Sequence, residues 1–572
     1  MSRSAEATFT RAAALLGMVS ATLAASGQAL PVVSPPLPLT PAGEEWIECS
    51  VGVSQTNKND VLVMANRQVN GQRTNLGYAS VMWGVAAPTT GVTGLGKADA
   101  YLAPHPVDGT IWFAAVNTDN TSLPQIVAGW KEPGVSDVPA SQIALIGNYL
   151  SEDKPGMAIG TLPSPLFGRR YYVVRVNNSN PCSGNVREKV VFTDNPGADW
   201  FTTPQEPIES FDGACDYRGF APAPVVLDSG RIVVAVRDFF EDGQWLFNGG
   251  KPYVVYSDDG GYDWKSDDIS SPIKIAPDNL ANATDWENDC GNVCPSTSCY
   301  PSDPSGAACS TCGETPMQID RRMCAPAIAA DRTQDPNHVY VAFYARSAAE
   351  STNTDIIIHR SVDGGETFDP STQDNPDFLH LTDALLGLTA GTHGPDQLVP
   401  AIAVDACGGV NVMFYDNRHD PDPDDCEIWY DVYFARITNF GPTPTVAQWR
   451  LTPNSFRVDN LLSANGLSND MLGDYHHMTV SADGTTLYLA SIARNMGDPE
   501  DGARTCSLHR VNLNCLGAGP ADFTGDGEVN GADMEGYLAA FAGGEAAADV
   551  DLDWAVGLDD FITYAEWYVE RE

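Results

Sequence analysis

A run of β-branched and aromatic residues recurs seven times in this 572-residue chain. Turn-forming residues bound each run, and most runs follow a second apolar segment. This composition is typical of β-strands, and a repeat of short strands predicts units that stack radially or linearly. The seven runs occupy residues 60–67, 109–117, 170–177, 231–237, 338–346, 409–418 and 486–494.

A β-propeller is the architecture that suits such a repeat best. Each four-stranded blade covers the face of its neighbour, so no long strand edge stays exposed. We therefore predict an all-β propeller over residues 44–515 with seven blades. Six blades are the alternative, in which the first and last units share one blade. The widest interval between runs holds a Cys-rich stretch at about 280–324, which we interpret as an insertion.

Short acidic segments follow three of the apolar runs. Residues 257–264 read SDDGGYDW, residues 361–368 read SVDGGETF, and a degenerate copy, TDNPGADW, occupies 193–200. The pattern resembles the Asp-box of sialidase-like, or BNR-repeat, propellers. In that motif the hydroxyl and carboxylate bond the backbone of a tight hairpin, glycine takes a positive φ, and the aromatic ring fills the gap between blades. The resemblance implies a sialidase-like fold in which Asp259 and Asp363 are structural.

Arginines end five of the seven runs. Equivalent positions in a propeller lie on one ring, where several guanidinium groups can converge on an anion. The segment LGDYHHMTV adds a tyrosine beside two histidines. The candidate ligand-binding residues are therefore Arg67, Arg237, Arg346, Arg418, Arg494 and Tyr475.

Two classes of function stay open. Sialidases use an arginine triad, a Tyr–Glu nucleophile and an Asp acid/base, so the resemblance permits an exo-α-sialidase-like glycoside hydrolase. The Arg-Ile-Pro segment of sialidases is missing here, however, and no glutamate can be matched to the partner of the nucleophile. The arginines can equally pair with acids such as Asp238 and Asp416. We therefore favour a non-catalytic binding protein, with glycans as possible ligands, and assign no catalytic residue.

Residues 516–572 form a second, acidic module. Two segments, 522–533 and 549–560, align at a spacing of 27 residues. Both place oxygen ligands at loop positions 1, 3 and 5 and a carboxylate at position 12, a spacing that suits Ca²⁺. A helix is expected after each loop. The predicted ligands are Asp522, Thr524, Asp526, the Glu528 carbonyl and Asp533, then Asp549, Asp551, Asp553, the Ala555 carbonyl and Asp560.

An aspartate at position 12, with no helix before the first loop, resembles the duplicated loop–helix unit of a type I dockerin. The resemblance implies calcium as a cofactor and a cohesin-like anchoring protein as a partner. The second loop carries Trp554 where the motif has glycine, so we expect the first loop to be the better calcium site. The expected core of this module is Phe523, Val529, Tyr537, Leu538, Phe541, Phe561, Tyr564 and Trp567.

The N-terminus has the pattern of a targeting segment. Basic residues flank an apolar stretch at 12–25, and small residues at 27–29 suit a cleavage site, so we predict a signal peptide over 1–29. Residues 30–43 are Pro-rich and predict an extended linker. No later segment is apolar enough to span a membrane. We therefore expect a secreted protein, extracellular or associated with the cell surface.

Charge and cysteine content narrow the partners and the covalent structure. A formal net charge of −43 repels phosphates and anionic lipids, so nucleic acid is excluded as a partner. Thirteen cysteines in an exported chain favour disulfides. We predict local bridges Cys506–Cys515 and Cys407–Cys426. We interpret the cysteines in the insertion as a disulfide-stapled loop rather than a zinc site.

Overall fold

The computed structural model describes residues 31–513, 529–543, 550 and 556–571, with internal gaps of which the longest are 203–218, 275–324 and 459–472. The predicted signal peptide and the Cys-rich insertion lie outside the described residues. By their contacts the residues form two compact units. The larger comprises 36–484 and 488–509, and the smaller includes helices α2 (Gly531–Gly543) and α3 (Leu558–Arg571).

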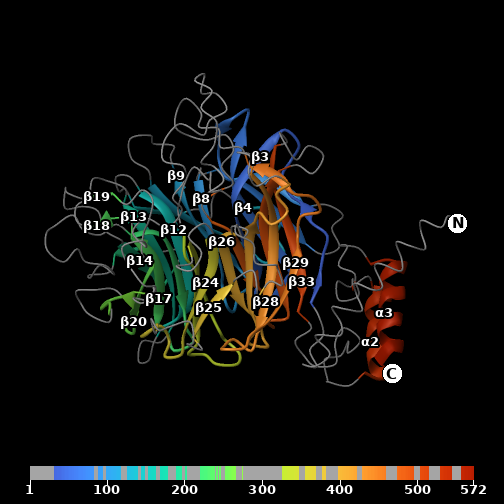
Figure 1. Ribbon diagram of the computed structural model, residues 1–572. Coiled ribbons are helices and arrows are strands. Elements are labelled where there is room, and N and C mark those ends of the chain that lie inside the picture. The colour runs from blue at the N-terminus through green and yellow to red at the C-terminus, as the bar shows by residue number, and fades with distance from the viewer. Residues whose placement is uncertain are drawn as a thin grey trace. The chain divides into compact units, whose positions relative to one another are not determined.

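Seven antiparallel sheets, each with a path of four strands, follow one another along the chain (Figure 1). The first three are β3 (Glu44–Ser54), β4 (Asn57–Val69), β6 (Gly77–Met82) and β7 (Thr89–Val92); β8 (Ala98–Pro104), β9 (Ile111–Asn117), β10 (Gln125–Lys131) and β11 (Ala144–Gly147); and β12 (Glu152–Thr161), β13 (Arg169–Asn177), β14 (Lys189–Thr193) and β15 (Phe201–Thr202). The next two are β16 (Gly219–Val226), β17 (Ile232–Asp238), β20 (Pro252–Ser257) and β21 (Ile273–Lys274); and β22 (Ala327–Ala330), β23 (Val339–Arg346), β24 (Thr354–Ser361) and β25 (Phe378–Leu381).

The last two sheets are β26 (Gln397–Val404), β27 (Val410–Asp416), β28 (Ile428–Thr438) and β29 (Thr445–Arg450); and β31 (His477–Val480), β32 (Thr486–Arg494), β33 (Arg504–Asn512) and β1 (Val32–Val33). Short additions are β2 (Leu37–Pro38) on β33, β5 (Gln72–Arg73) on β4 and β30 (Phe456–Val458) on β28. A separate two-stranded ribbon joins β18 (Phe240–Glu241) to β19 (Gln244–Trp245).

The innermost strands form a closed ring. Each contacts the next, in the order β3, β8, β12, β16, β22, β26 and β31, and β31 contacts β3. A closed ring of seven four-stranded blades is a seven-bladed β-propeller. The prediction of seven blades is therefore confirmed, and the six-bladed alternative is wrong.

The last blade takes strands from both ends of the propeller sequence. Val32 pairs with Asn512 and Leu37 with Leu508, which adds β1 and β2 to β33. Residues 30–43, which we expected to form a linker, thus contribute two short strands instead. Their proline content is compatible with this place, because an outer edge strand needs no N–H donor on its free side.

The seven recurring runs of the sequence are the second strands of the blades. Every residue of β9, β27 and β32 is buried. Neighbouring blades cover both faces of these strands, so the runs read as continuous apolar stretches and not as alternating ones. The hydrophobic cores accordingly lie between blades: one cluster joins Leu62 and Met64 of β4 to Leu102 of β8 and Phe113 of β9.

The second Asp-box has the geometry that its sequence predicts. Ser361 Oγ donates to Asp363 Oδ1 at 2.7 Å, Gly365 N donates to Ser361 Oγ at 2.8 Å, and Thr367 N donates to Asp363 Oδ1 at 2.9 Å. Gly365 has a φ of 85°. Phe368 is buried in the core shared by the fourth and fifth blades. In the first box, the ring of the aromatic residue (Trp264) is likewise buried between the third and fourth blades.

An arginine of the preceding blade holds each of these two turns. Arg231 Nη1 donates to Asp363 O at 2.9 Å and to Gly364 O at 3.1 Å. Arg170 Nη1 donates to Gly260 O at 2.8 Å. The boxes therefore contribute to contacts between blades as well as to their own hairpins.

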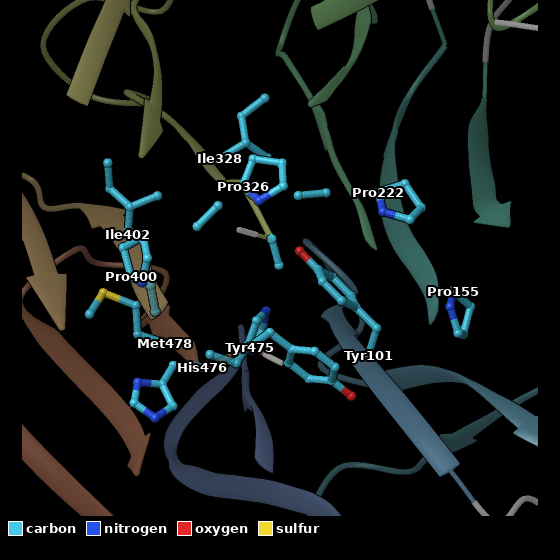
Figure 2. A pocket seen from close by; sticks show the side chains of 15 residues that line it. Tyr101, Pro155, Pro222, Pro326, Ile328, Pro400, Ile402, Tyr475, His476 and Met478 are labelled. Atoms are coloured by element: carbon cyan, nitrogen blue, oxygen red, sulfur yellow. The ribbon is translucent and has the colours of Figure 1, made fainter. Parts of the chain in front are cut away.

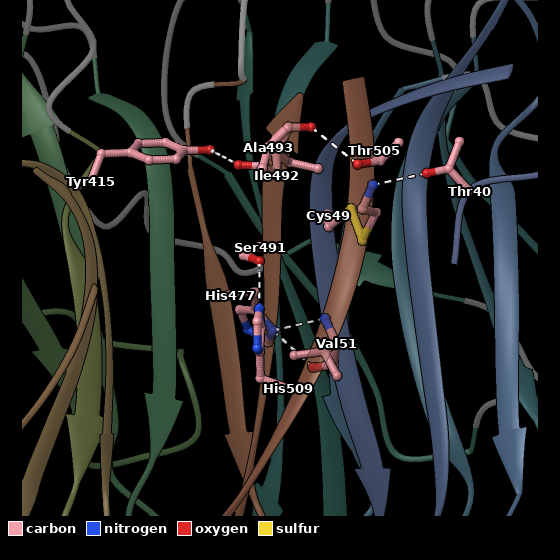
Figure 3. Close-up of a disulfide and its surroundings, with 11 residues drawn as sticks. Thr40, Cys49, Val51, Tyr415, His477, Ser491, Ile492, Ala493, Thr505 and His509 are labelled. Carbon is pink, nitrogen blue, oxygen red and sulfur yellow. Dashed lines mark hydrogen bonds between the residues drawn. A yellow bond between two sulfur atoms is a disulfide. The ribbon is translucent and has the colours of Figure 1, made fainter. Parts of the chain in front are cut away.

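A disulfide joins the first and last blades (Figure 3). It links Cys49 of β3 to Cys506 of β33, which are 457 residues apart in sequence. The predicted local bridge Cys506–Cys515 is therefore wrong, because closure of the ring brings β33 beside β3. Cys407 is disulfide-bonded, but its predicted partner, Cys426, lies outside the described residues, so that pairing stays a prediction.

Helices α2 and α3 pack against each other through residues that are 27 positions apart, which is the spacing of the repeat in the sequence. Tyr537 and Tyr564 are fully buried, and their rings stack with centroids 3.8 Å apart. Phe541 and Phe561 pack against this pair, as predicted. Leu538 is 42% exposed, so its assignment to the core is wrong: it lies on the outer face of α2. Among the described residues, no helix is both long and apolar enough to cross a membrane.

Candidate functional site

Five of the inner strands (β3, β8, β12, β16 and β26) share an irregularity in their pairing with the second strand. Register with the second strand breaks between Ile47 and Ser50, Ala98 and Tyr101, Asp153 and Gly156, Phe220 and Ala223, and Leu398 and Ala401. Three residues at these breaks have positive φ: Glu48 at 54°, Asp99 at 57° and Val399 at 51°. Such β-bulges re-aim side chains, and here they recur at the same place in successive blades.

Three of the inner strands carry a proline at this place, namely Pro155, Pro222 and Pro400, and Pro326 comes directly before β22. Pro155, Pro222 and Pro400 lie within the register breaks, where no ladder pair forms, so they remove no ladder hydrogen bond. The four prolines are arranged around one pocket, with Tyr101 and Tyr475 on its other side (Figure 2). We call this cavity of about 80 Å³ the central pocket.

The polar groups of the central pocket come from the second and last blades. Tyr475 lies just before β31, and its hydroxyl donates to Ala100 O at 3.3 Å. The ring of Tyr101 meets the ring of His477 edge-on, with centroids 4.9 Å apart. Burial raises the pKa of the Tyr101 phenol to about 12, so it stays protonated near neutral pH.

The two histidines of the central pocket are uncharged near neutral pH. Burial lowers the pKa of His476 to about 3 and that of His477 to about 4. His477 Nδ1 lies 2.8 Å from Val51 O, which ties β31 to β3 (Figure 3). Among the described residues that line the pocket there is no Asp, Glu, Lys or Arg. The pocket therefore offers apolar walls, hydroxyls and neutral imidazoles, but no formal charge.

The predicted arginine ring is not brought to this pocket in the described part of the chain. Arg67 donates to Glu44 at 2.5 and 2.7 Å, and that hydrogen bond lowers the pKa of Glu44. Arg418 pairs with Asp416 at 2.6 and 2.8 Å. Arg494 is buried at the end of β32. Arg237 lies one residue before the end of β17 and Arg346 ends β23, but their side chains lie outside what the structure describes. Of the predicted residues, Tyr475 does line the pocket.

Sequence reasoning missed a group of buried polar residues beside the central pocket. Asn66 donates from Nδ2 to both Glu48 and Asp99, and the distance to Asp99 Oδ1 is 3.1 Å. Asp99 N donates back to Asn66 Oδ1 at 2.6 Å. Gly473 passes so close that a Cβ there would meet Glu48 Cγ at 2.5 Å. The segment that carries Tyr475 is thus packed against this carboxylate pair.

A signal for the pocket was present in the sequence. The strands before three of the recurring runs read APAPVV, APAIAA and VPAIAV, and each places a proline at the same distance from the turn that follows. A repeated proline in an otherwise good strand marks an edge strand. In a propeller the protected edge faces the central channel. The repeated prolines could therefore have indicated, from the sequence alone, which strands face the channel.

Of the predicted calcium ligands, only the last one of each loop is among the described residues. Asp533 Oδ2 accepts a hydrogen bond from Asn530 N at 2.8 Å, and Asp560 Oδ2 accepts one from Gly557 N at 2.7 Å. These two carboxylates are 0% and 1% exposed and occupy equivalent places in the repeat. The other eight predicted ligands lie outside the described residues, among which no metal-binding cluster is found.

Comparison with known proteins finds only distant structural likenesses. No protein-family model matches the chain, and no curated protein matches it significantly. Solved structures that resemble it include an α-L-arabinofuranosidase of Fusarium graminearum (9% identity, 85% of this chain and 98% of the other, TM-score 0.38) and a Hadza microbial sialidase (11% identity, 70% and 65%, TM-score 0.36). A leech intramolecular trans-sialidase is 7% identical over 71% and 68%, with a TM-score of 0.37. Likenesses this distant carry no argument about activity.

The buried histidines make a prediction about pH. The pKa of His476 in the folded protein, about 3, lies below the ordinary value near 6.5, so the unfolded chain takes up the proton first as pH falls. Stability is therefore complete above about pH 6.5 and is lost progressively toward pH 3. We expect His476→Phe, which keeps the ring contact with Tyr415, to reduce the loss between pH 7 and pH 5 by about 2 kcal/mol. Chemical denaturation at both pH values measures it, and equal losses in the variant and the wild type would contradict it.

Proposed function

We propose that this protein is an exported propeller that binds ligands. Its central pocket binds an uncharged part of the ligand, such as one face of a sugar ring. Its C-terminal module binds calcium and anchors the protein to a cohesin-like partner. The proposal on the pocket is supported by its walls, which combine tyrosine rings with prolines. Pockets for small ligands are mostly apolar and carry a few placed polar groups, and tyrosine supplies both kinds of surface.

The observation that carries the binding function is the lack of charge among the described residues that line the central pocket. Glycoside hydrolysis in most families needs two carboxyl groups beside the scissile bond. Recognition of a sialic acid carboxylate needs cations, and guanidinium groups are the usual choice. Arg67 and Arg418 are instead bonded to Glu44 and Asp416. A pocket without charged residues therefore suits ligand binding better than it suits the hydrolysis or the carboxylate recognition that a sialidase needs.

One arrangement favours a hydrolase as the second candidate. The Tyr475 hydroxyl bonds Ala100 O, and Asp99 and Glu48 are joined through Asn66 next to it. A tyrosine with two carboxylates is the set that sialidases use. Glu48 is 0% exposed and Asp99 is 5% exposed, however, so neither can reach a substrate in this conformation. We therefore retain binding as the proposed function.

Binding and hydrolysis predict opposite results in one pair of assays. On a glycan array we expect wild-type protein to bind at least one glycan, and Tyr101→Ala to weaken that binding about tenfold, since a lost ring contact costs on the order of 1–3 kcal/mol. Tyr262→Ala is the matched control, because Tyr262 is 40% exposed in an Asp-box turn. We expect no turnover of fluorogenic sialosides or arabinofuranosides. Turnover that Glu48→Gln and Asp99→Asn abolish would establish the hydrolase instead.

The calcium proposal is supported by the paired helices and by the chemistry of the loops. Asp533 and Asp560 already turn back toward the loop backbone at equivalent positions. Their donor type fits Ca²⁺, which prefers hard oxygens. Bound calcium would supply positive charge to an acidic segment and so offset its self-repulsion. The role of these two side chains would be to close each loop onto the start of its helix.

Calorimetry of the full chain tests the calcium proposal. We expect Asp526→Ala to weaken Ca²⁺ binding about tenfold or more and Asp553→Ala to weaken it less, because the first loop keeps the glycine that the sharp turn requires. Glu535→Ala is the matched control: it removes the same charge from an exposed position on α2. No heat of binding, or equal loss in Asp526→Ala and Glu535→Ala, would leave only an acidic appendage.

A further inference from the structure

A second cavity of about 230 Å³ adjoins the central pocket. It is lined by the ends of the inner strands and the turns that follow them, and it shares Tyr101, Ile328, Ile402, His477 and Met478 with the central pocket. Those shared side chains separate the two spaces. We call the second cavity the Arg332 chamber, after the one strongly basic residue among its described lining.

The walls of the Arg332 chamber are mostly apolar. Side chains from six inner strands contribute, among them Leu102, Met157, Val225, Val404 and Val480. No Asp, Glu or Lys occurs among the described residues that line it, although the chain carries 75 acidic residues. His477 is uncharged near neutral pH because burial lowers its pKa to about 4. Arg332 is therefore the only formal charge among the described residues of the lining.

Arg332 is presented by a turn that is held at both ends. The turn follows β22, and Asp331 Oδ1 accepts hydrogen bonds from Thr333 N at 2.8 Å and Gln334 N at 2.9 Å. Gln334 Nε2 donates to Ala406 O of the next blade at 2.9 Å. Because its backbone is fixed in this way, ligand binding has to order only the side chain of Arg332.

The guanidinium of Arg332 keeps most of its donors available. Within the described part of the chain, its one hydrogen bond runs from Nη2 to Val226 O at 3.2 Å, and the side chain is exposed. Asp228 places an opposing charge near the guanidinium. Asp228 is exposed and is not part of the lining. The acids of the adjoining turns are engaged elsewhere: Asp331 within its turn and Asp405 with Arg436 at 2.7 Å.

We propose that the Arg332 chamber is a second binding site, for a small monocarboxylate with an apolar body. The carboxylate pairs with the guanidinium, which offers two parallel N–H donors, and the apolar body lies against the walls. A single positive charge fits a monoanion. A doubly charged phosphate would leave one charge uncompensated beside apolar walls, which is costly. This site goes beyond the proposed function, because the central pocket contains no formal charge.

Titration calorimetry on the full chain at low ionic strength tests the proposal. The probes are 3-phenylpropionate and 3-phenylpropan-1-ol, which share a body and differ in charge. We expect wild-type protein to bind the acid about tenfold more tightly than the alcohol, as a charge-assisted hydrogen-bonded pair would give. Arg332→Gln should lower the affinity for the acid to that for the alcohol and leave the alcohol unchanged. Arg332→Lys should fall between the two, because lysine keeps the charge but not the fork.

Three further variants test whether the effect depends on charge at this site and whether it is independent of the central pocket. Asp228→Asn should tighten binding of the acid, since it removes an opposing charge. Arg73→Gln, at an exposed position in β5, is the matched control and should change nothing. Tyr475→Ala alters the central pocket alone and should leave the acid affinity intact, so failure of the proposed function can be told from failure here.

Three results would overturn the proposal of the Arg332 chamber. The first is equal affinity of the wild type for the acid and the alcohol. The second is no saturable binding of the acid. The third is the same loss of acid affinity in Arg332→Gln and Arg73→Gln, which would indicate general attraction to basic residues in place of a defined site.

Discussion

Contact between the first and last blades closes the ring on which the other features of the propeller depend. Strand β31 contacts β3, His477 Nδ1 meets the backbone of Val51 at 2.8 Å, and Cys49 is bonded to Cys506. We call this contact the seam. Each blade covers the apolar faces of two neighbours, so an open ring would expose the inner faces of two blades at once. In the chain-entropy model, linking residues 457 positions apart removes a large part of the freedom of the unfolded chain.

The seam also positions the central pocket. Tyr475 and His476 come from the segment before β31, whereas Tyr101 comes from β8 on the other side of β3. Only closure brings these side chains into one cavity, and the Tyr475–Ala100 hydrogen bond spans the first blade to do so. The Glu48–Asn66–Asp99 group lies at the same junction, and its side chains are fully or nearly buried. The seam thus determines which polar groups line the central pocket and which stay buried beside it.

The sequence revealed features whose causes are local or repeated. The seven second strands were visible because burial on both faces produces continuous apolar runs such as that of β9. The Asp-boxes were visible because their hydrogen bonds join residues within eight positions, as when Ser361 and Thr367 both donate to Asp363. The helices α2 and α3 follow their loops at the repeated spacing for the same reason. In contrast, Cys506 was assigned to a nearby cysteine because spacing says nothing about ring closure. The bond of Arg67 to Glu44 crosses between two strands, so it was hidden as well, whereas Asp416 stands two residues from Arg418 and was foreseen.

Equilibrium unfolding of the double variant Cys49→Ser/Cys506→Ser tests the role of the seam most directly. Serine keeps the size of each side chain but removes the bond between the blades. If closure is the constraint that supports the propeller, the free energy of unfolding should fall by about 2–5 kcal/mol relative to the wild type, with blades 1 and 7 losing protection from hydrogen exchange first. An unchanged free energy of unfolding, with uniform protection across all blades, would contradict that account.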